Sequence, residues 1–501
     1  MSQDPPDPGQ EQVGSGPEPD AAPTTATGPQ GTTVGDDPAA AAGKAALEAD
    51  AAAGAGNAAE RDSGAQLVAV LTSRGYRGLL LVSALVGVPV ALVGFGFLAL
   101  VHVLENLVWE SVPEALGMSE PTWWYAIVVL TFAGAIVGLT ISRLPGTGGH
   151  IPVHGLGSGM PTIPDLPAIV VAAVLSLTLG AVVGPEAPLV AIGAGAVLVM
   201  VRRTRLHDQP QALQLLAVAG SSAAISTIFG SPVIGAVLML EVVGLMGTQV
   251  LVAVLPAVLS AGVGALVFTG MGEWTGFSAP SLAIPGLSAT SFQLTDLLWT
   301  IPVAIVVAVL AQVTRRVGLR VADAAARRTV PATTAVGLVV GLCAAAYALL
   351  TDRPVADVLF SGETAIAELV TDPQGWAAGT LVLLLLFKGL AYAVSLGAFR
   401  GGPTFPALFL GAAFGILVGA LPGFGTAAGI AVGMAAATSA VLRLPITSIV
   451  LVALLLGPEA LSQIPLVMIA AVVGLVTAVG LDQRDSLRRR ASRREVTPDA
   501  A

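Results

Sequence analysis

Residues 184–188 read Gly-Pro-Glu-Ala-Pro and stand inside an otherwise apolar stretch that runs from 166 to 201. Proline costs a helix little near its first turn, and glycine lets a ligand approach the backbone closely. The motif therefore predicts the start of an apolar helix. A carboxylate in such a place is costly unless it has partners, which draws attention to Glu186. Two interpretations stay open from the residues alone: a gate that occupies an anion site until it is protonated, or an acid that caps a helix at a membrane edge.

Two other stretches place glycine and proline at the start of an apolar segment in the same way. They are Gly-Leu-Gly-Ser-Gly-Met-Pro at 155–161 and Gly-Gly-Pro-Thr-Phe-Pro at 401–406. Helix starts buried in a membrane present free N–H groups and a partial positive charge, and both favour an anion. Three such starts predict a site for a small dehydrated anion between broken helices.

The composition around these motifs is that of a membrane protein. Of the 501 residues, 54% are hydrophobic and 11% are charged, whereas roughly 25% are charged in an average soluble domain. This excludes a single water-soluble enzyme, and the continuous apolar runs argue against a β-barrel. The single cysteine, Cys343, excludes a disulfide framework, and no His, Asp or Glu cluster has the spacing of metal ligands.

Charge and hydrophobicity divide the chain into three parts. The net charge of −9 lies entirely in residues 1–66, which hold 11 acids and two bases. We expect an acidic, disordered N-terminal tail over 1–73, an all-α polytopic membrane domain over 74–481, and a polar, basic C-terminal tail over 482–501. Apolar segments are predicted near 78–107, 122–143, 166–201, 211–247, 249–271, 299–313, 331–350, 376–398, 404–441 and 445–480. Internal Gly and Pro predict that some of them split, at 230–232 and at 422–423.

Basic residues predict the orientation. Arginines precede the first segment, follow the last one, and group near 202–205 and 315–328, where we expect loops. By the positive-inside tendency, both termini and the Arg loops face the cytoplasm of a multi-pass protein in the cell membrane. The basic C-terminal run is read as a topology signal, so no nucleic-acid partner is expected.

Taken in order, these motifs resemble the CLC family of chloride channels and chloride/proton exchangers. Residues 157–161 are similar to the family's GSGIP, 184–188 to GREGP, and 402–406 to GIFAP; further likeness lies at 231–241, 359–363 and 443–447. The resemblance implies a homodimer in membrane lipid with a pore for chloride or a similar small anion in each subunit. It implies a CLC-type inverted repeat of broken and tilted helices, with halves near 74–270 and 298–481, and no cofactor or enzymatic activity.

The resemblance also implies roles for individual residues. Glu186 is the gate, and the anion is bound by the hydroxyl of Ser158 and by groups around it. The anion-binding residues that the resemblance implies are Gly157, Ser158, Gly159, Glu186, Ala187, Thr404 and Phe405.

The chain departs from the family pattern in ways that bear on function. Pro185 and Pro403 remove two amide donors near the anion, and residues 445–480 contain no Tyr to supply the family's hydroxyl. The inner proton-transfer Glu of exchangers falls on Val242, while Glu241 stands one residue earlier. Passive anion conduction is therefore preferred, with chloride/proton antiport as the alternative and Glu241 and Val242 as the positions of a proton path.

Two weaker alternatives remain. An inverted-repeat secondary transporter for another solute has the same broken helices. An intramembrane serine hydrolase would use His150 or His154 with Ser158, but it leaves Glu186 and 401–406 unexplained. Lys388, inside an apolar segment, either adds positive potential near the anion path or snorkels to an interface.

Overall fold

A computed structural model describes residues 65, 67–157, 159–244, 248–275, 293–457 and 462–496, which belong to one compact unit. Most of the predicted N-terminal tail lies outside the described residues. Residues 67–72 are helical, and Ser73 caps the helix that begins at Arg74 by accepting a hydrogen bond from the Tyr76 amide at 3.1 Å.

The described part of the chain is helical, and eight of its helices are long and apolar enough to cross a membrane. The first half contains α2 (Arg74–Asn106), α3 (Val112–Ala115), α4 (Trp123–Arg143), α5 (Leu166–Thr178), α6 (Glu186–Val201), α7 (Pro210–Phe229), α8 (Pro232–Val243) and α9 (Thr248–Thr275). The second half contains α10 (Leu294–Arg327), α11 (Thr329–Thr351), α12 (Ala365–Thr371), α13 (Ala378–Ala398), α14 (Thr404–Val418), α15 (Thr426–Leu442), α16 (Pro445–Leu456) and α17 (Ile464–Val496).

Both predicted breaks are confirmed. Gly230 ends α7 in the left-handed conformation, with a φ of 57°, and Pro232 begins α8. Gly423, with a φ of 72°, lies in the turn between α14 and α15. Glycine adopts such angles without the steric cost that other residues incur, so these positions stop a helix inside an apolar stretch.

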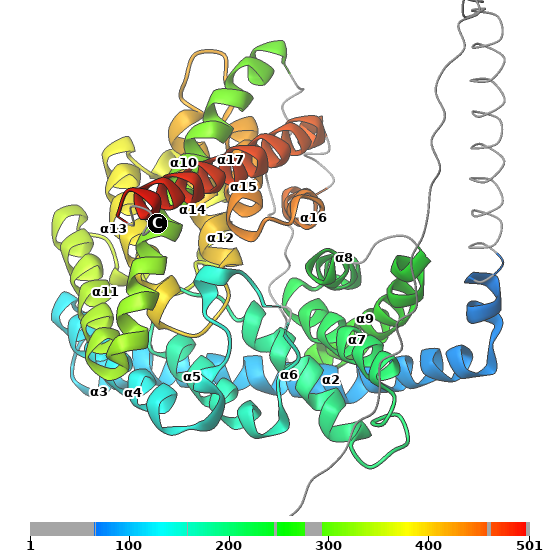
Figure 1. Ribbon diagram of the computed structural model, residues 1–501. Helices are drawn as coiled ribbons and strands as arrows, with labels where there is room; N and C mark the ends of the chain where they lie inside the picture. The colour runs from blue at the N-terminus through cyan, green and yellow to red at the C-terminus, as the bar shows by residue number, and fades with distance from the viewer. Residues whose placement is uncertain are drawn as a thin grey trace, which may run out of the picture. The chain divides into compact units, whose positions relative to one another are not determined.

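The two halves repeat one packing pattern (Figure 1). In the first half, α2 packs on α7 and α9, and α7 packs on α6, α8 and α9. In the second half, α10 packs on α15 and α17, and α15 packs on α14, α16 and α17. The equivalent helices α4 and α11 contact each other, as do α8 and α16. The fold is thus the predicted all-α repeat of broken helices.

The α4–α11 contact depends on glycines that let the two backbones approach. A Cβ atom on Gly337 would collide with the carbonyl oxygen of Leu130, and one on Gly134 would collide with the carbonyl oxygen of Thr333. Small residues of this kind are the usual means by which membrane helices pack closely.

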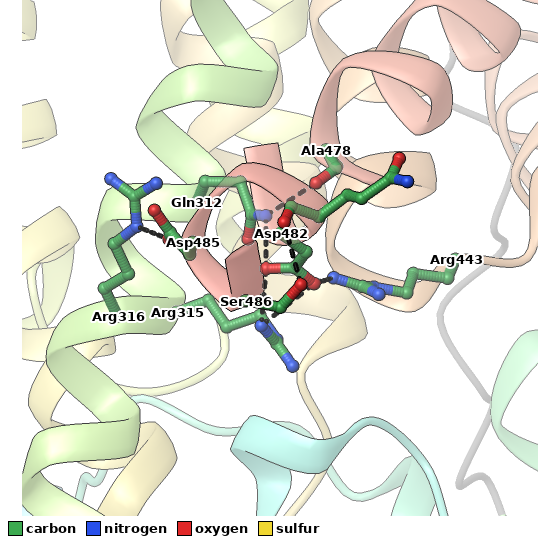
Figure 2. Close-up of polar contacts among 9 residues, drawn as sticks. Gln312, Arg315, Arg316, Arg443, Ala478, Asp482, Asp485 and Ser486 are labelled. Atoms are coloured by element: carbon green, nitrogen blue, oxygen red, sulfur yellow. Dashed lines mark hydrogen bonds and ion pairs between the residues drawn. The ribbon is translucent and has the colours of Figure 1, made fainter. Parts of the chain in front are cut away.

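The last helix is held near its middle by a polar network (Figure 2). From α10, Gln312 donates to Asp482 at 2.8 Å, Arg315 pairs with Asp482 at 3.0 Å, and Arg316 pairs with Asp485 at 2.7 Å. Arg443, at the end of α15, also bonds Asp482. The network therefore ties α17 to the two helices beside it.

One expectation for these arginines is wrong. The predicted segment 299–313 is the middle of α10, which continues to Arg327, so Arg315 and Arg316 lie on a helix and not in a loop. The helix outlasts its apolar run, because these basic side chains find acidic partners on α17. The helix α17 likewise continues to Val496, through the polar tail predicted from 482.

We predict that Gly337→Ala destabilises the fold. The added methyl group meets a backbone carbonyl that cannot move aside, and overpacking of this kind costs about 1–3 kcal/mol. Gly96→Ala on α2 is the matched control, because nothing lies near its added Cβ. Thermal unfolding of the two variants in detergent should show a lower midpoint for Gly337→Ala alone, and an unchanged midpoint would contradict the close packing of α4 and α11.

Candidate functional site

The starts of α6 and α14 meet, although they lie more than 200 residues apart. Gly184 and Gly402 form an isolated antiparallel bridge, in which the Gly184 amide donates to the Gly402 carbonyl at 2.7 Å and the Gly402 amide donates back. A side chain at Gly402 would collide with the carboxylate of Glu186. Glycine is needed here so that the two equivalent loops of the repeat pair beside that carboxylate.

Glu186 is the first residue of α6, and its side chain is completely buried. Its Oε1 accepts a hydrogen bond from the Phe405 amide at 2.9 Å, in the first turn of α14. Its Oε2 has no hydrogen-bond partner in the part of the chain that the structure describes. The carboxylate thus occupies the place at a helix N-terminus that a free anion would take.

Aromatic side chains surround this contact. The ring of Phe405 stacks on Phe229, with ring centroids 5.3 Å apart, and Tyr392 from α13 donates its hydroxyl to the Pro403 carbonyl at 2.7 Å. Tyr392 was missed by the sequence analysis, which looked for a Tyr only in 445–480. Its hydroxyl bonds the turn that begins α14, so it positions the helix that carries the Phe405 amide.

A cavity of about 850 Å³, here called the Glu363 cavity, lies on one side of Glu186. Acidic side chains line it together with Pro185, the residue before Glu186; the acids are Glu105, Glu110, Glu120, Asp357, Glu363 and Glu368. Desolvation and the nearby charges of Glu186 and Glu105 raise the pKa of Glu363 to about 8. Arg353 and His102 line the cavity as well, and Arg353 pairs with Asp357 at 2.8 Å, so acids outnumber bases in its wall.

A smaller cavity of about 240 Å³, here called the Arg400 cavity, lies on the other side. Ala187, the residue after Glu186, lines it together with Gly157, Gly159, Arg400 and Gly401. Pro185 lines one cavity and Ala187 the other, so the main chain at Glu186 passes from one to the other, although Glu186 itself is not among the lining residues of either. Movement of its side chain is the simplest way in which they could communicate.

The structure divides the predicted anion-binding residues into two groups. Gly157, Gly159 and Ala187 line the Arg400 cavity, whereas Thr404 and Phe405 begin α14 and neither lines it. Ser158 lies outside the described residues. Arg400, between two predicted segments, was missed because an isolated arginine near the end of an apolar run reads as a topology signal.

Of the two histidines of the hydrolase alternative, His150 lines the Arg400 cavity. The ring of His150 packs against Gly157, where a Cβ atom would collide with it, and His154 lies beside it with ring centroids 6.3 Å apart. Burial, followed by the proximity of His154, lowers the pKa of His150. His150 is therefore predominantly neutral at pH 7, and it adds little positive charge to the cavity.

Glu241, a candidate for the proton path, is bonded to the start of α16. Its carboxylate accepts from the amides of Ile446 at 3.0 Å and Thr447 at 2.7 Å, and from the Thr447 hydroxyl at 2.7 Å. It therefore acts as a capping acid for α16, a role that satisfies backbone N–H groups left without partners by the helix. Val242 packs against the hydrophobic core.

Lys388 does not snorkel to an interface, contrary to one of the two expectations. Its side chain is fully buried, and its Nζ donates to the carbonyls of Asp357 at 3.0 Å and Leu359 at 2.8 Å. The ammonium also lies 4.5 Å from the centre of the Phe409 ring. Lys388 thus holds the 357–360 turn, which lines the Glu363 cavity, against its own helix α13.

Comparisons with known proteins agree with this architecture. Residues 134–479 match the sequence model of the family described as "Voltage gated chloride channel". The "Putative ion-transport protein YfeO" of Escherichia coli O1:K1 is 28% identical over 337 residues, which cover 66% of this chain and 77% of that protein.

Two solved structures share the fold. One is a slow cyanobacterial Cl−/H+ antiporter, with a TM-score of 0.66, 19% identity, and coverage of 80% of this chain and 94% of that one. The other is a CLC-type fluoride/proton antiporter, with a TM-score of 0.62, 18% identity, and coverage of 81% and 96%.

We predict that Glu241→Gln weakens the protein mainly through the lost cap of α16. A hydrogen bond to a charged group contributes about 1.5–3 kcal/mol, so the unfolding midpoint should fall measurably. Thr447→Ala removes the hydroxyl partner, and a double-mutant cycle should show that the two losses are not additive. Additive effects, or an unchanged midpoint in Glu241→Gln, would show that this contact is not the role of Glu241.

Proposed function

Because the chain belongs to the voltage-gated chloride channel family, we propose that it carries a small anion, chloride first, across the cell membrane along a path gated by Glu186. One observation carries the proposal: the Glu186 carboxylate sits on the Phe405 amide, between the Glu363 cavity and the Arg400 cavity. A carboxylate in that place competes with a free anion for the same donor. Transport needs it to leave, and protonation makes it leave by removing its charge.

The polypeptide is a transporter and not an enzyme in this proposal. The binding groups around Glu186 are backbone amides and small residues, which suit a dehydrated anion better than a reacting carbonyl. We place both termini in the cytoplasm, in keeping with the arginines near 202–205 and 482–494, so that the acidic Glu363 cavity faces outward. Two subunits, each with its own path, complete the proposed assembly.

The residues on the proposed cytoplasmic side of the path support passive conduction better than coupled exchange. An exchanger needs a carboxylate that takes protons from the cytoplasm, and Val242 cannot bind one. Glu241 is held by three hydrogen bonds at the start of α16. If Glu241 moved away to carry a proton, the amides of Ile446 and Thr447 would lose their hydrogen-bond acceptor.

Coupled exchange of an anion for a proton is the second candidate. Two proteins of the same fold are described as Cl−/H+ and fluoride/proton antiporters. The acids of the Glu363 cavity also give protons a route to Glu186 from one side. The missing element is a route from the other side, which the Arg400 cavity would have to supply through water or His150.

We predict that wild-type chloride flux rises as pH falls and that Glu186→Gln abolishes this dependence. Protonated Glu186 is neutral and leaves the Phe405 amide, and glutamine mimics this neutral state at every pH. The measurement is chloride efflux from proteoliposomes without sodium or ATP, at pH values from about 5 to about 8, around the usual range of perturbed carboxyl pKa values.

The matched control is Glu110→Gln, which removes an exposed carboxylate from the wall of the Glu363 cavity. It should keep the wild-type pH dependence. A mutant at Glu186 that still responds to pH would remove this residue from the gating role.

We also predict that a chloride gradient drives little or no uphill proton movement in proteoliposomes. Val242→Glu places a carboxylate where exchangers need one, so it should change the coupling more than Glu241→Gln does. Simultaneous chloride and proton recording is the measurement. Robust proton pumping by the wild type, lost in Glu241→Gln, would establish exchange and make Glu241 the inner proton acceptor.

A further inference from the structure

We propose that Arg400 is a fixed cationic ligand for the transported anion, at a binding site in the Arg400 cavity beyond the gate. This inference rests on the proposed function and names a residue that neither the motifs nor the family resemblance assigns. The site would take a small monovalent anion. Its parts are the Arg400 guanidinium, the glycines at 157 and 159, and the start of α6 at Ala187.

The charge on Arg400 is buried and is not neutralised by an acid. Only 6% of the residue is exposed, and no carboxylate pairs with its guanidinium among the residues that the structure describes. An arginine keeps its proton in proteins, so the full positive charge remains. A buried charge without a counter-ion is costly, and an anion in the adjoining cavity would relieve that cost.

The hydrogen bonds of the guanidinium leave one donor for such an anion. Its Nε and Nη2 donate to the Thr147 carbonyl at 3.2 and 3.1 Å, and its Nη1 donates to the carbonyls of Ala398 and Phe399, each at 3.3 Å. A guanidinium has five N–H groups. The second N–H of Nη2 therefore has no partner among the described residues, on a side chain that lines the cavity.

The position of Arg400 is fixed by its surroundings. Its amide donates to the Ser176 hydroxyl on α5 at 3.1 Å, and the stem of its side chain packs against Gly148. Three carbonyls then hold the planar head. A ligand held in this way loses little freedom when the anion arrives, which favours binding.

Few hydrogen-bond donors for an anion are available near Glu186, and Arg400 supplies one. Pro185 and Pro403 have no amide hydrogen, and the Tyr392 hydroxyl already donates to the Pro403 carbonyl. Two other titratable side chains, His150 and Asp165, line the same cavity. His150 has a lowered pKa and is mostly neutral, and Asp165 accepts a hydrogen bond from the Thr162 hydroxyl at 2.6 Å. The fixed charge at Arg400 and the positive end of α6 attract an anion into this cavity, and the carboxylate of Asp165 opposes it.

The test is chloride binding by calorimetry, with flux from proteoliposomes, in the full-length protein. Arg400→Gln should weaken chloride binding at least about tenfold, the loss expected for a hydrogen bond to a charged group. The half-saturating chloride concentration of the flux should rise by a similar factor. Arg316→Gln is the matched control, because it removes a guanidinium that is paired with Asp485 and lines neither cavity. It should change both values by less than about twofold.

A second variant distinguishes anion binding by the charge of Arg400 from a purely structural role of its side chain. Arg400→His, combined with Glu186→Gln to silence the gate, should bind chloride more tightly at about pH 5.5 than at about pH 8, since imidazole is charged only at the lower value. Glu186→Gln alone is its reference and accounts for His150. A merely structural arginine would give no such gain of pH dependence, so this variant decides the question where Arg400→Gln does not fold.

The outcomes distinguish this inference from the proposed function. If the wild type transports chloride and both Arg400→Gln and Arg400→His bind it as their references do, Arg400 is structural and only the inference is overturned. If the wild type neither binds nor transports an anion, both are overturned.

Discussion

The hydrogen bond from the Phe405 amide to Glu186 Oε1 joins the starts of α6 and α14, one from each half of the protein. The bond requires a carboxylate at the first residue of one helix and an unoccupied amide in the first turn of the other. It also requires the loops before them to lie close, which the Gly184–Gly402 bridge achieves. A helix that crossed the membrane without a break would bury neither end, so the broken helices exist to bring these termini together.

That constraint explains the distribution of glycine. The repeat can bury two helix starts only if the helices around them pack without large side chains. The α4–α11 contact at Gly134 and Gly337 achieves this, and Gly411 with Gly433 does the same between α14 and α15. The repeat therefore combines small residues at its helix contacts with an acid, Glu186, at only one of its two helix starts. The asymmetry gives the proposed path one gate.

Local patterns predicted those features that depend on neighbouring residues. Gly230 and Pro232, two residues apart, mark the end of one helix and the start of the next, and the apolar run around Glu186 makes its charge conspicuous. The sequence could not place partners that lie far along the chain. Glu241 caps α16 through Thr447, and Arg400 bonds Thr147. Likewise, α10 continues beyond its apolar run because Arg315 and Arg316 meet acids on α17. The hydrophobic pattern of α10 alone does not show that these acidic partners lie on α17.

The two buried cations illustrate why position decides function here. Lys388 and Arg400 are both held by backbone carbonyls, and neither has a carboxylate partner within ion-pair distance among the described residues. The ammonium of Lys388 has three donors and at least as many carbonyls around it, so its hydrogen-bonding capacity is filled and it serves to hold a turn. The guanidinium of Arg400 has five donors, four of them bonded, and it borders a cavity. The same desolvated charge is thus architectural in one place and available to an anion in the other.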